Sequence, residues 1–267
     1  MYDKNAPQDR ADAVSWRIMP SWNIHTAHVE RLLADCEPDD LGIEDVNAFL
    51  FGNYVPDIYL GFMVADITFH VDYCLTHMAE PNVTPVPDAD HFWDLYVCRH
   101  RMPAARRSMA LGAWAHLMAD RMYNGRFRSF ATDPGAPKGD ELRECKQADF
   151  DVFGRSLALS MRVRVDDELV EAAGKYRPYS ILPDDVVRTV ARADEIVAAN
   201  ASPERGGRYL LLGEEWMNAT FEACDARLKA WMRAWKALDG RGARTTSVDV
   251  RKEAGLPSAS PLEIDVA

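Results

Sequence analysis

The chain has 267 residues, 48% of them apolar, so it can bury one large core. Its formal net charge of −11 at pH 7 argues against a protein that holds duplex nucleic acid through phosphate contacts, since that binding needs a basic face. Its five cysteines are an odd number without a CxxC pair, which indicates reduced thiols rather than a disulfide framework.

The first 18 residues are polar, so they predict a disordered leader and lack the apolar core of a signal peptide. No uncharged apolar run reaches the roughly 18 residues of a membrane-spanning helix. We therefore expect a cytoplasmic protein with a leader over 1–18, one main domain over 19–239 and a polar tail over 240–267.

Apolar residues at spacings of three and four predict helices along most of the chain, so the expected fold class is all-α, a multi-helix bundle. In chain order the predicted helices cover 26–34, 42–52, 67–78, 88–101, 103–123, 141–161, 169–173, 183–199 and 209–238. The segment 67–78 also suits a strand, because it is rich in β-branched and aromatic residues. Residues 129–139 are predicted to form a loop.

Two of these helices carry further expectations. The helix over 103–123 is apolar nearly all round, so it should be central and buried. The helix over 209–238 spaces Trp216, Phe221, Trp231 and Trp235 like a packing face, which either covers the domain or forms a homodimer contact. The tail from Gly240 is predicted to be a loosely ordered arm or a short partner-binding strand.

All seven histidines lie in the first 116 residues, and this segregation indicates a site. The pattern is clearest at His116 and Asp120, which project from one face of the buried helix. Burying both is unfavourable unless each has a partner, and a metal ion would satisfy the two together. The alternative is a buried His–Asp pair that ties helices together.

Further polar residues stand in apolar surroundings. Asp57 follows Pro56 and is either a ligand or the N-cap of the next turn. His25 and His77 are each preceded by a β-branched residue; alone, either would suit an ordinary core histidine. Two polar runs, 146–150 and 214–216, are interpreted as solvated helix faces.

Four motifs occur in order along the chain. They are Met19-Pro20-Ser21-Trp22-Asn23-Ile24-His25, Gly52-Asn53-Tyr54-Val55-Pro56-Asp57, Thr76-His77-Met78, and Leu111-Gly112-Ala113-Trp114-Ala115-His116-Leu117-Met118-Ala119-Asp120. In order and spacing they resemble the zinc-dependent phospholipase C family, whose superfamily also contains zinc-dependent single-strand nucleases. The resemblance covers residues 19–124, with weaker similarity to about residue 160.

The resemblance implies a helical fold that holds zinc between buried helices. The positions that match the family's ligands are His25, Asp57, His77, His116 and Asp120. His28, one turn further on, is a substitute for His25.

The ligand set is shorter than in the family, whose phospholipases use three zinc ions. Three ions need roughly nine ligand groups, and this chain has about five and no histidine after His116. One or two zinc ions are therefore expected, with Asp57 or Asp120 able to bridge a pair. Cys145 and Asp149 stand where a later ligand pair would be, although a cysteine on an apolar helix face usually belongs to the core.

The implied activity is hydrolysis of a small phosphodiester or phosphate ester, such as a phospholipid head group. Asp57 would be the bridging carboxylate and the proton acceptor for an acidified water. Trp22, Tyr54, Tyr59 and Trp93 are candidates to line the entrance. Two alternatives remain open: a one-metal or metal-free helical protein with a structural or interaction role, and a nuclease or phosphatase on the same scaffold.

Overall fold

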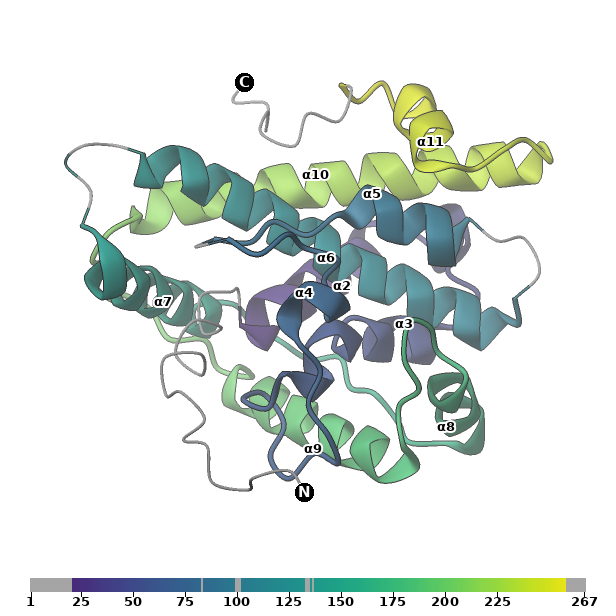
Figure 1. The fold of residues 1–267 in the computed structure, drawn as a ribbon, viewed down its shortest axis with the longest axis horizontal. Helices are drawn as coiled ribbons and strands as arrows, with labels where there is room; N and C mark the ends of the chain where they lie inside the picture. Colours follow the sequence, from purple (N-terminus) through teal and green to yellow (C-terminus); the bar gives the residue numbers. More distant parts are fainter. Residues whose placement is uncertain (1–20, 83, 99–101, 133–134, 136, 258–267) are drawn as a thin grey trace, which may run out of the picture.

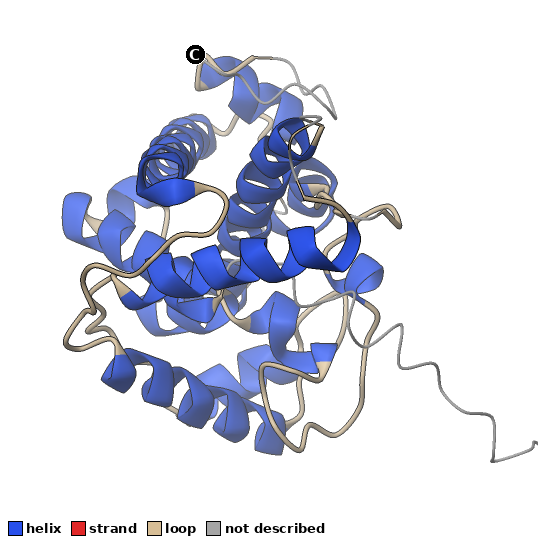
Figure 2. Cartoon of the chain, turned by 90° about the vertical axis from the view of Figure 1, so that its left-hand side faces the viewer, coloured by secondary structure: helices blue, strands red, loops and turns tan. Residues whose placement is uncertain are grey.

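The computed structural model describes residues 21–82, 84–98, 102–132, 135 and 137–257. Within these ranges the chain forms helices and loops and no strand (Figure 2), so the expected all-α class is confirmed for the part described. The predicted leader, the Met19-Pro20 start of the first motif and His100 lie outside the described residues.

Helices follow one another along most of the described chain. In chain order they are α2 (Trp22–Asp35), the 3-10 helix η1 (Pro38–Leu41), α3 (Val46–Gly52), the 3-10 helix η2 (Val55–Leu60), α4 (Tyr73–Thr76), α5 (Ala89–Phe92), the π-helix η3 (Trp93–Val97), α6 (Ala104–Ala131), α7 (Gly139–Arg155), α8 (Asp167–Gly174), α9 (Pro183–Ala199), α10 (Gly213–Gly240) and α11 (Ser247–Glu253).

The long helices agree with the sequence pattern better than the short ones. Helix α9 has the predicted bounds, whereas α6 runs eight residues past the predicted end at residue 123 to Ala131. Helix α7 stops at Arg155, short of the predicted 161, and the Asn200 side chain donates to the carbonyl of Gly154 in its last turn at 2.7 Å and to that of Leu157, just past its end, at 2.9 Å.

Two predicted segments differ more strongly. Only Tyr73–Thr76 of the segment 67–78 is helical; Asp72 is its N-cap, and the Asp72 carboxylate accepts a hydrogen bond from the backbone N–H of Cys74. The tail is not wholly a loose arm, because α11 forms within it and buries Val250. Residues 258–267 lie outside the described part.

Helix α6 lies at the centre of the molecule, as expected from its apolar sequence, and α10 runs beside it (Figure 1). Between them lies a cluster of tryptophans. Trp93 makes edge-on contacts with Trp114, Trp231 and Trp235, at ring-centroid distances of 4.9, 5.5 and 5.4 Å. The Trp231 and Trp235 face of α10 therefore packs inside this chain and is not a free surface for a second copy.

Helices α3 and α6 cross in close backbone contact at two glycines. A Cβ atom on Gly112 would lie 2.1 Å from the carbonyl oxygen of Phe49, and one on Gly52 would lie 2.1 Å from that of Met109. Only glycine permits this approach. The crossing carries Asn53, the next residue after α3, to within reach of α6.

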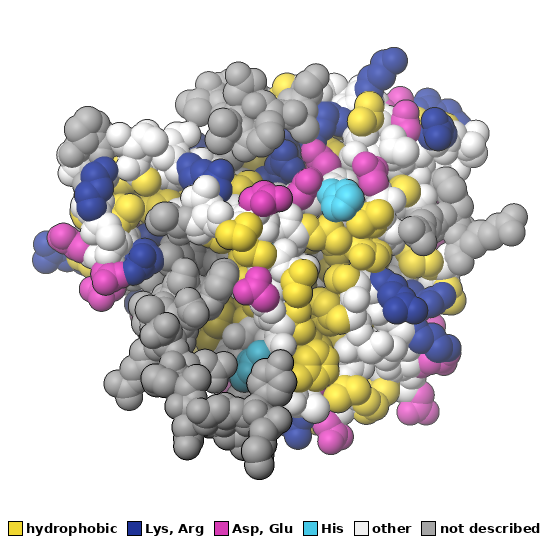
Figure 3. Space-filling model, viewed as in Figure 1, with side chains coloured by type: hydrophobic (Ala, Val, Ile, Leu, Met, Phe, Trp, Pro, Cys, Tyr) yellow, Lys and Arg dark blue, Asp and Glu magenta, His cyan; other side chains and the backbone are white. Residues whose placement is uncertain are grey.

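None of the described helices is long and apolar enough to cross a membrane. On the face shown in Figure 3, Lys and Arg side chains are interspersed with Asp and Glu around an apolar region. None of the five cysteines forms a disulfide bond.

Candidate metal centre

Five side chains from four segments meet in the interior, and they are the five that the sequence motifs indicated. His25 lies on α2, Asp57 on η2, His77 directly after α4, and His116 and Asp120 one turn apart on α6. Asp57 is 2% exposed and the other four are 0% exposed. His25, His77, His116 and Asp120 are therefore shielded from bulk water, and Asp57 nearly so.

Asp120 stands between the histidines. Its Oδ1 lies 3.2 Å from Nε2 of His25, and its Oδ2 lies 3.3 Å from Nε2 of His77 and 3.7 Å from Nε2 of His116. The Nε2 atoms of His77 and His116 are 3.3 Å apart. Oδ1 of Asp57 lies 3.5 Å from Nε2 of His77 and 3.7 Å from Nε2 of His116.

Several of these atoms are buried without a hydrogen bond. Among the described residues, neither nitrogen of His25 has a hydrogen-bond partner, and neither does Oδ1 of Asp57 or Oδ1 of Asp120. Each unsatisfied buried polar atom costs about 1–3 kcal/mol. Imidazole nitrogens and carboxylate oxygens are common zinc ligands, so the donor set fits a divalent metal ion.

Two overlapping groups of three are spaced to hold an ion. One is His25, His116 and Asp120, and the other is Asp57, His77 and His116; within each group the ligand atoms lie within 4.8 Å of one another.

A second layer of hydrogen bonds orients the two central histidines. Nδ1 of His116 donates to the carbonyl oxygen of Asn53 at 2.8 Å. Nδ1 of His77 lies 2.7 Å from Oγ1 of Thr76, and that hydroxyl donates to the carbonyl of Tyr73 and so accepts from the imidazole. Both rings therefore present Nε2, with its lone pair, to the cluster.

Asp57 is oriented in a similar way, and not as a helix cap. The indole N–H of Trp22 donates to its Oδ2 at 2.9 Å, which leaves Oδ1 facing His77 and His116. The alternative interpretation of Asp57 as an N-cap is therefore wrong: the carboxylate points into the cluster.

The ionisation of the cluster follows from burial and from its own charges. Burial, reinforced by His25, lowers the pKa of His116 to about 4, so its imidazole is neutral at pH 7. Burial opposes ionisation of Asp120, but the close approach of His25 and His77 to its carboxylate outweighs burial and holds the pKa of Asp120 well below its usual value. At His116 and Asp120 the result is neutral imidazole beside ionised carboxylate, the forms that bind metal. At His77 burial is outweighed by the nearby Asp120 and Asp57, which raise the pKa of its imidazole.

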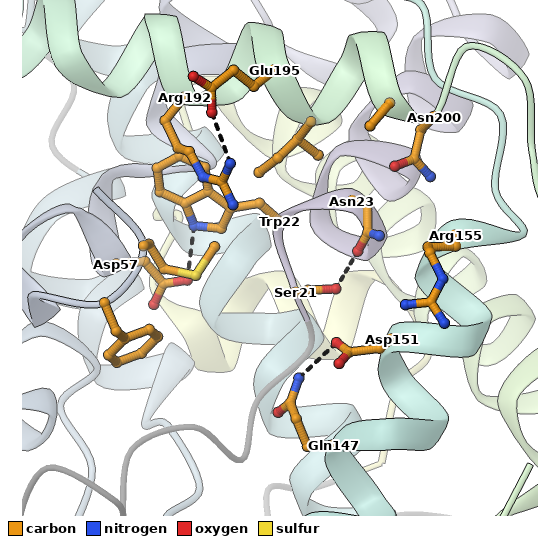
Figure 4. Close-up of a pocket in the computed structure, with 14 residues that line it drawn as sticks. Ser21, Trp22, Asn23, Asp57, Gln147, Asp151, Arg155, Arg192, Glu195 and Asn200 are labelled. Carbon is orange, nitrogen blue, oxygen red and sulfur yellow. Dashed lines mark hydrogen bonds and ion pairs between the residues drawn. The ribbon is translucent and has the colours of Figure 1, made fainter. Parts of the chain in front are cut away.

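A cavity of about 530 Å³ opens beside the cluster, between the start of α2, helix α7 and helix α9 (Figure 4). Trp22 and Asp57 form one wall, and Arg155 and Arg192 lie on the walls made by α7 and α9. Asp57 is the one member of the cluster that lines this cavity. The volume of the cavity is in the range found for small-molecule binding sites.

Of the four aromatic residues expected at the entrance, only Trp22 lines the cavity. Tyr54 bonds Thr26, Tyr59 bonds Asp185, and Trp93 belongs to the tryptophan cluster; all three are core residues.

His28, the substitute for His25, points away from the cluster. Its Nδ1 lies 2.6 Å from Oδ1 of Asp225 on α10, and its ring stacks on Phe221. His25 is therefore the member of α2 that reaches the centre, while His28 ties α2 to α10. His70 and His91 are exposed.

The Cys145 and Asp149 alternative is not realised. Asp149 is buried, but its carboxylate accepts from the backbone N–H groups of Leu210, Leu211 and Leu212, just before α10. Cys145 is half-buried, and like Cys74 it belongs to neither ligand group. Asp149 therefore has a structural role: it satisfies the backbone N–H groups of the segment that leads into α10.

Lys146 is a buried charged residue, although the polar run 146–150 predicted a solvated face. It is 0% exposed, donates to Oδ1 of Asn124 at 2.9 Å and lies over the rings of Phe127 and Phe150. Burial lowers its pKa to about 7, which the charge of Asp120 partly opposes. Its spacing of four from Leu142 and from Phe150 was the signal that it shares an apolar helix face.

Comparison of the chain with protein-family models, with curated proteins and with solved structures gave no match.

Proposed function

We propose that the protein is a metal-dependent hydrolase of small phosphate esters or phosphodiesters, with a phospholipid head group as one candidate substrate. The observation that supports this most is the convergence of five buried His and Asp side chains beside a cavity, with four of their polar atoms lacking a hydrogen-bond partner among the described residues. A bound divalent cation would acidify a water molecule and stabilise negative charge on a phosphate oxygen.

The residues of the cavity suit a phosphate group. Arg155 and Arg192 present guanidinium groups, which match phosphate geometry. They are now paired with Glu204 and Glu195 at 3.0 and 2.8 Å, and these exposed pairs contribute little to stability. An anionic ligand can therefore compete for both arginines.

Asp57 connects the cavity with the cluster. Because it lines the cavity and also faces His77 and His116, a ligand in the cavity would meet the cluster at this carboxylate. Trp22 holds its other oxygen, so the orientation of Asp57 does not depend on the ligand.

The test begins with elemental analysis of protein purified without added metal. We expect at least one equivalent of metal, and zinc-dependent hydrolysis of a generic phosphodiester or a phosphatidylcholine analogue. His77→Ala should abolish both, and the exposed His91→Ala should change neither. Less than one equivalent, together with unchanged stability of His116→Ala, would contradict the proposal. Hydrolysis of single-stranded DNA alone would favour the nuclease alternative.

A structural metal centre is the second candidate. The full burial of His25, His77, His116 and Asp120 favours it, because structural sites are closed to solvent. In that case metal removal lowers the melting temperature, and the protein hydrolyses neither the phosphodiester, nor the phosphatidylcholine analogue, nor single-stranded DNA.

A further inference from the structure

A second cavity, of about 930 Å³, is lined by the loop before α5 and by residues of α5, α6 and α11 (Figure 1). None of the five residues of the metal cluster lines it. We infer that this cavity binds an elongated anion with two acidic groups joined by an apolar spacer, and that Arg121 and Arg128 hold the two groups. The inference does not depend on the metal centre or on the proposed hydrolysis.

The two arginines lie on one face of α6. They are seven residues, or about two turns, apart, so they enter the cavity at positions roughly 10 Å apart along the helix axis. Arg121 directly follows Asp120, but it projects about 100° further round the helix. The cavity and the metal cluster therefore use different faces of α6.

Arg128 is partly buried without a carboxylate partner. Its Nε donates to the carbonyl oxygen of Thr84 at 2.7 Å, and it forms no ion pair with any residue that the structure describes. Burial lowers the pKa of Arg128, and no nearby carboxylate opposes this shift. An anionic ligand at the remaining N–H groups of the guanidinium would offset the cost of its burial.

Arg121, at the other position, has only distant carboxylates. Its Nη1 lies 3.4 Å from Oδ2 of Asp90 and 3.9 Å from Oδ1 of Asp88, beyond the usual hydrogen-bond distance. Both oxygens of Asp90 accept from Nη2 of Arg251, at 2.7 and 2.6 Å. Oδ1 of Asp88 accepts from the backbone N–H of His91 at 3.0 Å and caps α5. An acidic group of a ligand can therefore approach Arg121 more closely than either carboxylate does.

The loop before α5 keeps the two guanidinium groups apart. Thr84 binds Arg128 at one end. Asp88 lies beside Arg121 at the other end, and Asn124 of α6 donates to the loop backbone between them at 2.9 Å. A small anion would reach only one of the arginines, whereas a ligand whose acidic groups are roughly 10 Å apart would meet both.

The rest of the lining suits a spacer that is apolar. Val86 of the loop and Val248 of α11 line the cavity, and Val248 is 73% exposed, so a hydrocarbon chain would cover it. Two further carboxylates line the cavity. The oxygens of Asp94 accept from the backbone N–H and the hydroxyl of Ser247, at 2.6 and 2.7 Å, and Glu80 is exposed, so solvent screens its charge.

The experiment measures the binding of three probes to the natural protein by isothermal titration calorimetry. Decanedioate has two carboxylates on a long apolar chain, butanedioate has two on a short chain, and decanoate has one on a long chain. We expect one equivalent of decanedioate to bind, at least about 10-fold more tightly than either other probe, because it alone can meet both arginines.

Substitution of each arginine locates the site. Arg121→Gln and Arg128→Gln should each bind decanedioate about 10-fold to 100-fold more weakly, since each loses one charged partner. Arg126→Gln is the matched control on α6: Arg126 donates to the carbonyl of Ala219 at 3.1 Å and does not line the cavity. Its affinity for decanedioate should equal that of the natural protein. Circular dichroism checks the fold of each variant.

Three results would overturn the inference: no binding of decanedioate to the natural protein, equal affinities for decanedioate and butanedioate, or full affinity in Arg121→Gln. If Arg128→Gln does not fold, Arg121→Gln still decides, because Arg121 makes only the two longer contacts with carboxylates. Metal content and hydrolysis are measured separately, so the proposed function and this inference can fail independently.

Discussion

The imidazole ring of His25 is stacked on the ring of His116 in the interior, joining α2 to α6 through two side chains that are both 0% exposed. Within the described residues neither nitrogen of His25 has a hydrogen-bond partner. The metal-free protein thus carries unsatisfied polar groups at the point where its central helices meet, and its stability should depend on metal.

Metal removal is predicted to destabilise the protein. An ion that binds the folded chain alone raises the free energy of unfolding by about 2.7 kcal/mol at a concentration one hundred times its Kd. Thermal unfolding at several zinc concentrations, and after chelation, measures the effect. The melting temperature of His77→Ala should not respond to zinc. A natural protein that melts at the same temperature with and without zinc would contradict the prediction.

Trp22→Phe is predicted to weaken metal binding. It removes the N–H that holds Oδ2 of Asp57 at 2.9 Å, and loss of such a partner costs about 10-fold to 100-fold in affinity. Trp114→Phe is the matched control, because Trp114 is equally buried and its indole nitrogen has no hydrogen bond among the described residues. Equal affinities of the two variants, measured by chelator competition, would show that the indole N–H has no such role.

Gly112→Ala is predicted to destabilise the protein by at least about 2 kcal/mol, since its Cβ would lie 2.1 Å from the Phe49 carbonyl oxygen. Gly174→Ala at the end of α8 is the control, because nothing lies within 4 Å of its added Cβ; there we expect a gain of about 0.5–1 kcal/mol. Urea unfolding of both variants measures the difference. A Gly112→Ala protein as stable as Gly174→Ala would show that the crossing can widen freely.

Lys146→Met is predicted to change how stability depends on pH. Between pH 7 and 10.5 the buried amine binds fewer protons in the folded state than in the unfolded chain. The free energy of unfolding of the natural protein therefore rises with pH through this window. The lysine is destabilising below about pH 7, and this penalty disappears as the pH approaches 10.5.

The methionine variant lacks this titration. Its stability relative to the natural protein should fall by up to about 1.4 kcal/mol per pH unit above pH 7. The lost hydrogen bond to Asn124 adds an offset that does not depend on pH. Lys252→Met, at an exposed position on α11, should show no such slope. If the difference in free energy of unfolding between Lys146→Met and the natural protein does not change between pH 7 and 9, the lowered pKa of Lys146 is refuted.

Local spacing predicts the long helices and the pairing of His116 with Asp120, whereas the full set of five cluster residues was expected only from the resemblance of the four motifs. Helix α6 has a continuous apolar pattern, and His116 and Asp120 are one turn apart on it. The short elements are less predictable: α4 depends on the Asp72 cap, and the residues before it that favour a strand have no strand beside them in the part of the chain that the structure describes.

Which histidine of α2 reaches the cluster, and how the rings are oriented, was not predictable, because both depend on contacts between distant segments. Nothing near His28 in the sequence shows that it meets Asp225, almost 200 residues away. Likewise, the orientation of His116 depends on a backbone carbonyl, which has no sequence signature. Lys146 was misplaced because a charge in a polar run usually indicates solvent, although its helix-face neighbours are apolar.

The glycine crossing of α3 and α6 has a consequence for the order of events during folding. The Asn53 carbonyl selects which nitrogen of His116 carries the proton, and it is in place only when α3 rests against Gly112. Before the two helices dock, the imidazole exchanges freely between its tautomers. Tight capture of a metal ion should therefore follow the docking of α3, so the ion would stabilise the finished core and not guide the earliest stages of its assembly.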